Sequence, residues 1–133
     1  MGSISPQKSI LVISLSKILT GHPVSAVVAA DWAKPKAATF KDKFDVQGFD
    51  LNSNDIPTTL KDLKSTLEGR RWDGVLVGWC TRGYPERTVL FEQVVAVFLD
   101  VMREGREMKL LFNTGPEDLV EPVVRNFVEA QGE

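Results

Sequence analysis

The 133-residue chain contains one cysteine, one histidine and one tyrosine, and these scarcities exclude several classes of protein. A single cysteine, Cys80, cannot form an internal disulfide, which favours a reducing, cytoplasmic location. One histidine and one cysteine do not make a recognisable zinc-binding spacing, so we expect no metal centre. The sequence also has no Walker motif and no GxGxxG fingerprint after its first predicted strand. We therefore expect a protein that works without a cofactor.

An excess of positive charge is absent too, since sixteen Lys and Arg residues stand against eighteen Asp and Glu residues, for a net charge of -2. Such a chain has no basic surface to hold a phosphate backbone, so we expect no nucleic-acid partner. Its longest apolar runs, such as Ile10–Ile13 and Val94–Leu99, fall far short of the ~20 residues that span a bilayer. Residues 1–9 also lack the order of a secretory signal, which is a basic segment followed by an apolar one. The sequence thus predicts neither a membrane span nor export.

What remains is the composition of an ordinary globular protein, with 43% apolar residues, 26% charged residues, 10 Gly and 7 Pro. A chain of this length makes one domain of the usual size. It contains no internal repeat, low-complexity segment or linker. Residues 1–133 are therefore predicted to form a single domain, with residues 1–8 as a flexible N-terminus.

Four short runs rich in branched apolar residues predict four β-strands. They are Ser9–Leu15, Phe44–Leu51, Gly74–Trp79 and Met108–Asn113. The first, third and fourth runs are almost continuously apolar, which is typical of parallel strands covered by helices on both faces. The second run alternates more between apolar and polar residues. We therefore place it at an edge of the sheet.

Segments with helical spacing of apolar residues separate and follow these strands. They are Pro23–Ala33, Thr58–Glu68, Pro85–Arg103 and Pro116–Glu129. Pro122 interrupts the last segment, so its regular part is expected to begin near Glu121. The alternation of strand and helix implies right-handed crossovers and a parallel sheet. The predicted fold is a flavodoxin-like, three-layer α/β/α sandwich with strand order 2-1-3-4.

The helix predicted at 85–103 carries more apolar side chains than a single sheet-facing stripe needs. They stand at positions 89–91, 94–99, 101 and 102. A four-stranded sheet has few layers in which such a helix can be buried completely. The simplest explanation is that a second copy of the chain covers the remaining apolar surface. This helix therefore predicts a homodimer.

Polar and aromatic residues stand at the carboxyl ends of the predicted strands, where open parallel sheets bind their ligands. They are Ser14, Ser16 and His22 after the first strand, Trp79, Cys80, Thr81, Arg82 and Tyr84 at the end of the third, and Asn113 and Thr114 after the fourth. The serines, the two aromatic residues, Thr81, Asn113 and Thr114 are expected to bind a substrate. The alternatives are core packing for Trp79 and N-capping of the last helix for Thr114.

Arg82 is the main candidate in this group, because a guanidinium on a glycine-flanked turn offers a planar fork of hydrogen-bond donors. Such a fork binds a carboxylate, a phosphate or an enolate oxygen. The structural alternative is an ion pair between Arg82 and Glu86 or Glu92. Glu86 itself can serve as an acid or base, or it can stabilise the start of the following helix.

His22 and Cys80 are the remaining catalytic candidates. His22 can act as a general base, or it can be a solvated loop residue. Cys80 stands between a buried strand and a helix start, a setting that favours a thiolate and can stabilise an oxyanion. It can also be a small packing residue. The phosphatase spacing of Cys, five residues and Arg is absent because position 86 is Glu, so we reject that class.

The segments 77–86 (VGWCTRGYPE), 90–92 (LFE) and 112–116 (FNTGP) together resemble a family of small, uncharacterised α/β proteins of flavodoxin-like or Rossmann-like fold. In that family a Gly-rich strand end leads to Arg, then to Pro-Glu and Leu-Phe-Glu, and the next strand ends in Phe-Asn-Thr. The residues that match are Arg82, Glu86, Glu92, Asn113 and Thr114. The family typically has a small residue at the position of Cys80, which favours Arg82 over a sulfur-based mechanism. The resemblance covers about the second half of the chain and implies no particular activity.

The sequence thus supports three hypotheses about function. The first is a small, cofactor-independent lyase, isomerase or cyclase that acts on a carbonyl-containing, anionic metabolite. Arg82 would hold an oxygen of this substrate, and His22 or Glu86 would move a proton. The second is a noncatalytic protein that binds a small ligand at the same edge or assembles with a partner. The third is a hydrolase that depends on Cys80.

Overall fold

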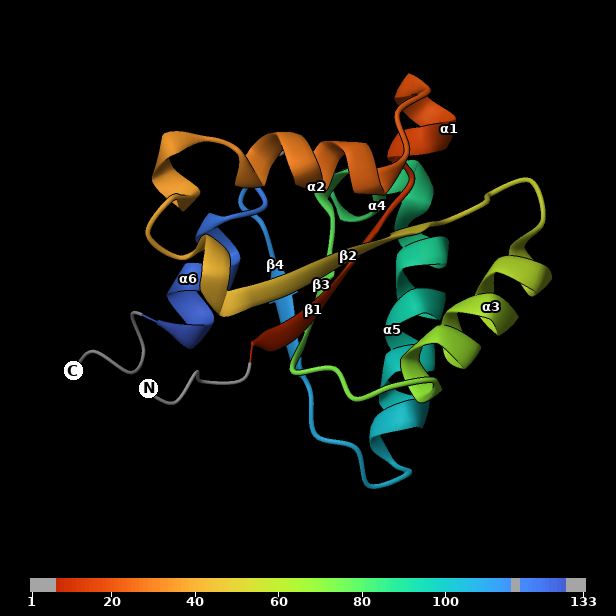
Figure 1. Cartoon of the computed structure of the whole chain (residues 1–133). Coiled ribbons are helices and arrows are strands. Elements are labelled where there is room, and N and C mark those ends of the chain that lie inside the picture. Colours follow the sequence, from red (N-terminus) through yellow and green to blue (C-terminus); the bar gives the residue numbers. More distant parts are fainter. Residues whose placement is uncertain (1–6, 116–117, 129–133) are drawn as a thin grey trace.

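A computed structural model describes residues 7–115 and 118–128 and contains one four-stranded sheet (Figure 1). All strand pairs are parallel and the strand order is β2-β1-β3-β4. The strands are β1 (Lys8–Ser14), β2 (Phe44–Asp50), β3 (Gly74–Val77) and β4 (Lys109–Phe112). The α/β fold and the strand order expected from the sequence are therefore confirmed. Of the N-terminal segment expected to be flexible, residues 1–6 lie outside the described part, whereas Lys8 already begins β1.

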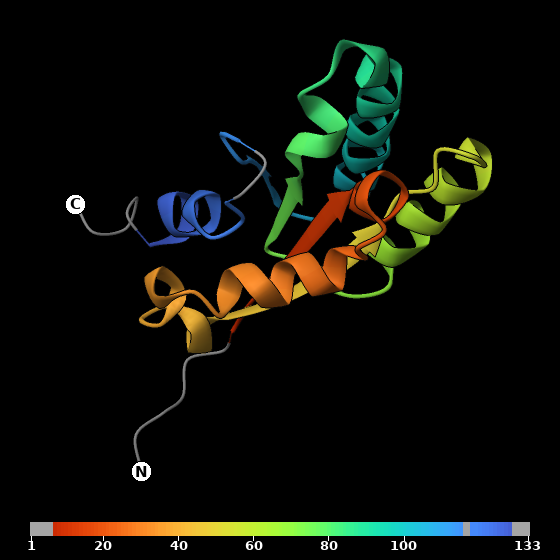
Figure 2. The same cartoon turned by 90° about the horizontal axis from the view of Figure 1, so that it is seen from above.

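Helices pack on both faces of the sheet and give three layers (Figures 1 and 2). They are α1 (Ser16–Thr20), α2 (Val24–Trp32), α3 (Ile56–Glu68), α4 (Trp79–Arg82), α5 (Thr88–Met102) and α6 (Glu121–Phe127), with 3-10 turns η1 (Pro35–Ala37), η2 (Lys41–Lys43) and η3 (Pro85–Arg87). One hydrophobic cluster joins the sheet to α2 and α6, and a second joins the other face to α3 and α5. In the described residues, no helix is long and apolar enough to cross a membrane.

The central strand β1 explains why an uninterrupted apolar run is needed here. Ile10 and Val12 contact the α2 and α6 layer, whereas Leu11 and Ile13 contact the α3 and α5 layer. Each of these four side chains is at most 1% exposed. Burying one such side chain contributes roughly 1.5–3 kcal/mol to folding. An alternating sequence would place polar groups in one of the two cores, so β1 has to be apolar throughout.

The two edges of the sheet are formed by β2 and β4. The edge position of β2 is confirmed, but the expectation that β4 is buried on both faces is wrong. In β4 only Leu111 is buried, Leu110 and Phe112 are half-buried, and Lys109 is exposed. The reason is that β4 pairs with β3 alone, so side chains of an apolar run still reach solvent at its outer side.

Helix boundaries differ from the expected ones where proline or a short turn intervenes. The helix expected from Pro85 begins only at Thr88, because the chain first makes the η3 turn. Trp79, expected at the end of a strand, instead begins α4. The regular start of the last helix near Glu121 is confirmed. Of its expected range, positions 116, 117 and 129 lie outside the described residues.

Candidate functional site

The loop that follows β1 is shaped by hydroxyl groups at the carboxyl edge of the sheet. The Ser16 N–H donates to Ser14 Oγ at 3.2 Å, and Ser16 Oγ donates to the carbonyl of His22 at 2.9 Å. Thr20 Oγ1 donates to the carbonyl of Ser16 at 2.8 Å and accepts from the N–H of His22 at 3.3 Å. These bonds hold α1 as a short turn beside the end of the strand. The same bonds place Ser14, Ser16 and Thr20 on one side of the candidate site.

On the other side, the chain leaves β3 through the short helix α4, which lies between two glycines. The Gly78 N–H donates to the carbonyl of Ile13 at 2.8 Å, so this turn is anchored to β1. A Cβ at Gly83 would lie only 2.4 Å from the ring of Trp79, which is too close for any side chain. Gly83 therefore permits the Trp79 ring to lie against the turn.

Arg82 is half-buried at this edge and packs against aromatic rings. Its guanidinium carbon lies 4.9 Å from the ring centroid of Trp79 and 5.4 Å from that of Phe112. Its Nη2 donates a hydrogen bond to the carbonyl of Asn113, 31 residues further along the chain. Among the described residues Arg82 forms no ion pair, so the structural alternative of pairing with Glu86 or Glu92 is wrong. Arg82 thus connects the end of β3 to the end of β4.

A cavity of about 180 Å³, which we call the rim cavity, lies between these segments. Its lining residues are Val12, Ser14, Ser16, Thr20, Val24, Val27, Gly78, Trp79, Cys80, Asn113 and Leu119. Hydroxyl, amide and thiol groups therefore share one space with valine and leucine side chains. No lysine, arginine, aspartate or glutamate from the described part of the chain lines it. Apolar walls with a few polar groups are typical of a site for a small organic molecule.

Three buried polar atoms at the ends of β3 and β4 lack hydrogen-bond partners in the part of the chain that the structure describes, and one of them belongs to Asn113, which lines the cavity. Thr81 Oγ1, Arg82 Nε and Asn113 Oδ1 are all buried and have no hydrogen-bond partner within the described chain. Asn113 is 1% exposed, and its Nδ2 donates to the carbonyl of Gly115 at 2.7 Å, which fixes the orientation of the amide. An unsatisfied buried polar group costs about 1–3 kcal/mol, so folded proteins rarely leave one unpaired. An unpaired acceptor on a residue that lines the cavity is a group that a bound molecule with an N–H or O–H could complete.

The structure brings together about half of the side chains expected at this edge. Ser14, Ser16, Trp79, Cys80 and Asn113 line the rim cavity. Thr81 and Arg82 belong to the same turn as Cys80. The expected function of all these side chains remains a prediction, but their convergence agrees with the topology.

The other expected residues lie away from the cavity. His22 is exposed, and its backbone carbonyl and N–H form hydrogen bonds with Ser16 and Thr20 of the same loop. Glu86 is exposed in η3, and α5 has no side-chain N-cap hydrogen bond. Tyr84 is 41% exposed, and Thr114 is exposed. The carboxylate of Asp118, and not the hydroxyl of Thr114, accepts hydrogen bonds from the first backbone N–H groups of α6.

Sequence reasoning did not assign two residues that shape the site. Thr20 lines the cavity, and its place in the polar loop after β1 is a signal that could have identified it. Arg87 donates from Nη1 to the carbonyl of Cys80 at 2.9 Å, and its guanidinium carbon lies 4.5 Å from the ring centroid of Tyr84. Arg87 thus fixes the backbone that carries the thiol. No spacing in the sequence indicates this contact.

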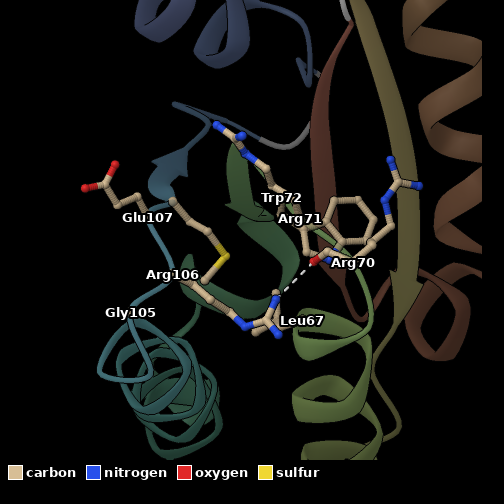
Figure 3. A pocket seen from close by; sticks show the side chains of 8 residues that line it. Leu67, Arg70, Arg71, Trp72, Gly105, Arg106 and Glu107 are labelled. Atoms are coloured by element: carbon tan, nitrogen blue, oxygen red, sulfur yellow. Dashed lines mark hydrogen bonds between the residues drawn. The ribbon is translucent and has the colours of Figure 1, made fainter.

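A larger cavity of about 420 Å³ lies at the amino ends of β3 and β4, where arginines surround apolar side chains (Figure 3). Arg70 Nη2 donates a hydrogen bond to Ser9 Oγ at 2.7 Å and forms an ion pair with Asp45 at 3.0 Å. Arg106 donates to the carbonyl of Glu68 at 2.9 Å, and Figure 3 shows it reaching toward the carbonyl of Arg70. These arginines are bound to the protein itself and join its loops. The rim cavity, with the unpaired Oδ1 of Asn113, is therefore the better candidate for a ligand.

No metal site and no relative add to this description. Within residues 7–115 and 118–128, no group of three or more His, Cys, Asp or Glu side chains is placed to hold a metal ion. No protein-family model, curated protein or solved structure matches the chain. The resemblance described from residues 77–116 stays a prediction.

Proposed function

We propose that the protein binds a small, carbonyl-containing organic molecule in the rim cavity. The observation that supports this function best is the unpartnered Oδ1 of Asn113, a buried residue that lines the cavity. Asn113 supplies an acceptor for an N–H or O–H of the same molecule. The valines of the cavity wall cover the apolar part of the ligand.

The walls of the cavity favour an uncharged ligand over the anion expected from the sequence. No charged side chain of the described chain lines the cavity. The charge of Arg82 is already shared between the carbonyl of Asn113 and two aromatic rings. An anion buried there would lose its hydration without gaining a full ion pair, which is costly. A neutral amide, ketone or aldehyde loses much less on entering.

The side chains around the cavity support ligand binding without turnover. An acid or base has to lie within hydrogen-bond reach of the proton that it moves. His22 and Glu86 are exposed and do not line the cavity. The lyase, isomerase or cyclase activity expected from the sequence therefore stays a prediction. It requires one of these two groups to move toward the ligand.

The proposal is tested by a thermal-shift screen of small amides, hydroxyketones, aldehydes and carboxylates, followed by calorimetric titration of the compounds that stabilise the protein. Asn113→Ala removes the buried acceptor and is expected to abolish the shift. Thr114→Ala is the matched control, because this neighbouring side chain is exposed and does not line the cavity. A ligand that binds wild type and Asn113→Ala equally well would contradict the assigned site.

A homodimer through α5 also remains a proposal. The helix turns Leu90, Val94 and Phe98 toward the sheet, while Val89 is 65% and Leu99 is 47% exposed. These two side chains are what a partner copy would cover. Light scattering at micromolar concentration is expected to report a dimer for wild type and a monomer for the double variant Val89→Lys, Leu99→Lys. A monomeric wild-type protein would contradict this proposal.

A further inference from the structure

Cys80 carries the only thiol of the chain, and it lines the rim cavity together with the buried, unpartnered Asn113. We infer that this thiol adds reversibly to the carbonyl carbon of a small aldehyde in the cavity, forming a hemithioacetal. The inference rests on the proposed function and names the substrate class of the same site. Two separate observations support it, namely the position of the thiol in the cavity and the unpaired Oδ1 of Asn113, which lines the same cavity.

The cavity brings a small ligand close to both groups. Its volume of about 180 Å³ is the space that about six water molecules occupy in the liquid. Cys80 and Asn113 both line this space, so an aldehyde held in the cavity is confined near the thiol and the unpaired amide oxygen. The backbone of Cys80 is fixed, because its carbonyl accepts from Arg87 Nη1 at 2.9 Å. The thiol is therefore presented to the ligand from a held turn, and Cys80 is partly exposed, so it can be reached.

The reaction is an addition, and every atom is accounted for. The sulfur of Cys80 forms a bond to the carbonyl carbon, and the π bond between that carbon and its oxygen breaks. The thiol proton ends on the oxygen, which becomes a hydroxyl group. No oxidant, reductant or leaving group takes part, and the reverse step releases the aldehyde unchanged.

The product matches the unpaired acceptor of Asn113 better than the free aldehyde does. An aldehyde oxygen only accepts hydrogen bonds, so it leaves Asn113 Oδ1 unpaired. The hydroxyl of the hemithioacetal both accepts and donates. It can therefore donate to Asn113 Oδ1 and satisfy this atom. The site therefore favours the adduct over the bound aldehyde.

The test uses the full chain and propionaldehyde labelled with carbon-13 at the carbonyl carbon. In the carbon-13 NMR spectrum, addition moves the signal from the aldehyde region to that of a saturated carbon bonded to sulfur and oxygen. The apparent Kd is expected to be about tenfold or more below that of N-acetylcysteine with the same aldehyde, the effect of one additional hydrogen bond. Cys80→Ala should lose the signal. Asn113→Ala should return the affinity to that of N-acetylcysteine, and Thr114→Ala should leave it unchanged.

A second measurement covers the case in which a variant does not fold. Propionaldehyde is expected to slow the alkylation of the single thiol of the wild-type protein by iodoacetamide. An adduct no tighter than that of N-acetylcysteine, or unslowed alkylation, would overturn the inference. Propionamide separates the two proposals, because it fits the same space but does not accept a thiol. If propionamide binds wild type and no adduct forms, thiol addition alone fails; if neither compound binds, the proposed function fails as well.

Discussion

Replacing Gly83 by alanine tests whether the α4 turn determines the shape of the rim cavity. The backbone at Gly83 has φ −79°, which alanine adopts without strain. The new Cβ would nevertheless stand 2.4 to 2.7 Å from three ring atoms of Trp79. Trp79 has to move away, and its ring lines the cavity and lies over the guanidinium of Arg82. The variant therefore perturbs the site through packing alone.

The expected cost is that of an overpacked interior, about 1–3 kcal/mol of unfolding free energy. For a chain of this length, each kcal/mol lowers Tm by roughly 3–6 °C. Differential scanning calorimetry measures the change in Tm, and calorimetric titration measures the accompanying loss of ligand affinity. Tm and ligand affinity are both expected to fall, because the displaced Trp79 ring carries Arg82 with it.

Gly115→Ala is the matched control for this substitution. A Cβ at Gly115 meets no atom within 4 Å, and the backbone there has no positive φ. This variant is expected to be as stable as wild type, or to gain up to about 1 kcal/mol from the reduced freedom of the unfolded chain. If Gly83→Ala and Gly115→Ala have the same Tm, the contact between the α4 turn and Trp79 does not shape the site.

Three further predictions concern individual contacts that stabilise the fold. Burial raises the pKa of Asp118, but hydrogen bonds from the first N–H groups of α6 and the ion pair with Lys36 outweigh it and lower the pKa below the ordinary value of 3.8. The carboxylate therefore stabilises the fold above that value and loses this effect as pH falls through the lowered pKa, so Asp118→Asn should make urea stability less dependent on pH in the acid range. Arg106→Ala should cost about 1–2 kcal/mol in urea unfolding, because it removes the hydrogen bonds to the carbonyls of Glu68, at the end of α3, and Arg70, in the loop that follows. The exposed Arg103→Ala should change stability by less than about 0.5 kcal/mol. Gly48→Ala would place a Cβ 2.8 Å from a backbone nitrogen of α2, so its Tm should fall as well, and an unchanged Tm would show that β2 and α2 are not in such close contact.

The strand order was predictable because it depends on periodicity and on general rules of chain connection. The uninterrupted apolar run of β1 indicates burial on both faces, and the alternation in β2 indicates an edge. Pro122 likewise indicates where α6 begins, since a proline fits the first turn of a helix but not its interior. The burial of β4 was not predictable in this way. Its sequence is as apolar as that of a central strand, and only the number of strands beyond it decides the exposure.

The candidate site was predictable as a location but not as a set of contacts. Parallel strands bring their carboxyl ends to one edge, which places Cys80 and Asn113 near one another. The short helices α1 and α4 have no apolar period, so the turns that orient these side chains leave no signal in the sequence. The partner of Arg82 is a backbone carbonyl 31 residues away, and every residue type offers such a carbonyl. His22 and Glu86 were selected for their chemistry, and their exposure depends on loop geometry that no motif encodes.

The position of β1 between β2 and β3 also has a consequence for amide hydrogen exchange. Its amides are paired on both sides of the strand, and its central side chains lie in two separate cores. Fraying at either edge of the sheet does not uncover them. Deuterium should therefore enter the middle of β1 only when the whole molecule unfolds, so the exchange rates of these amides would report the free energy of global unfolding directly.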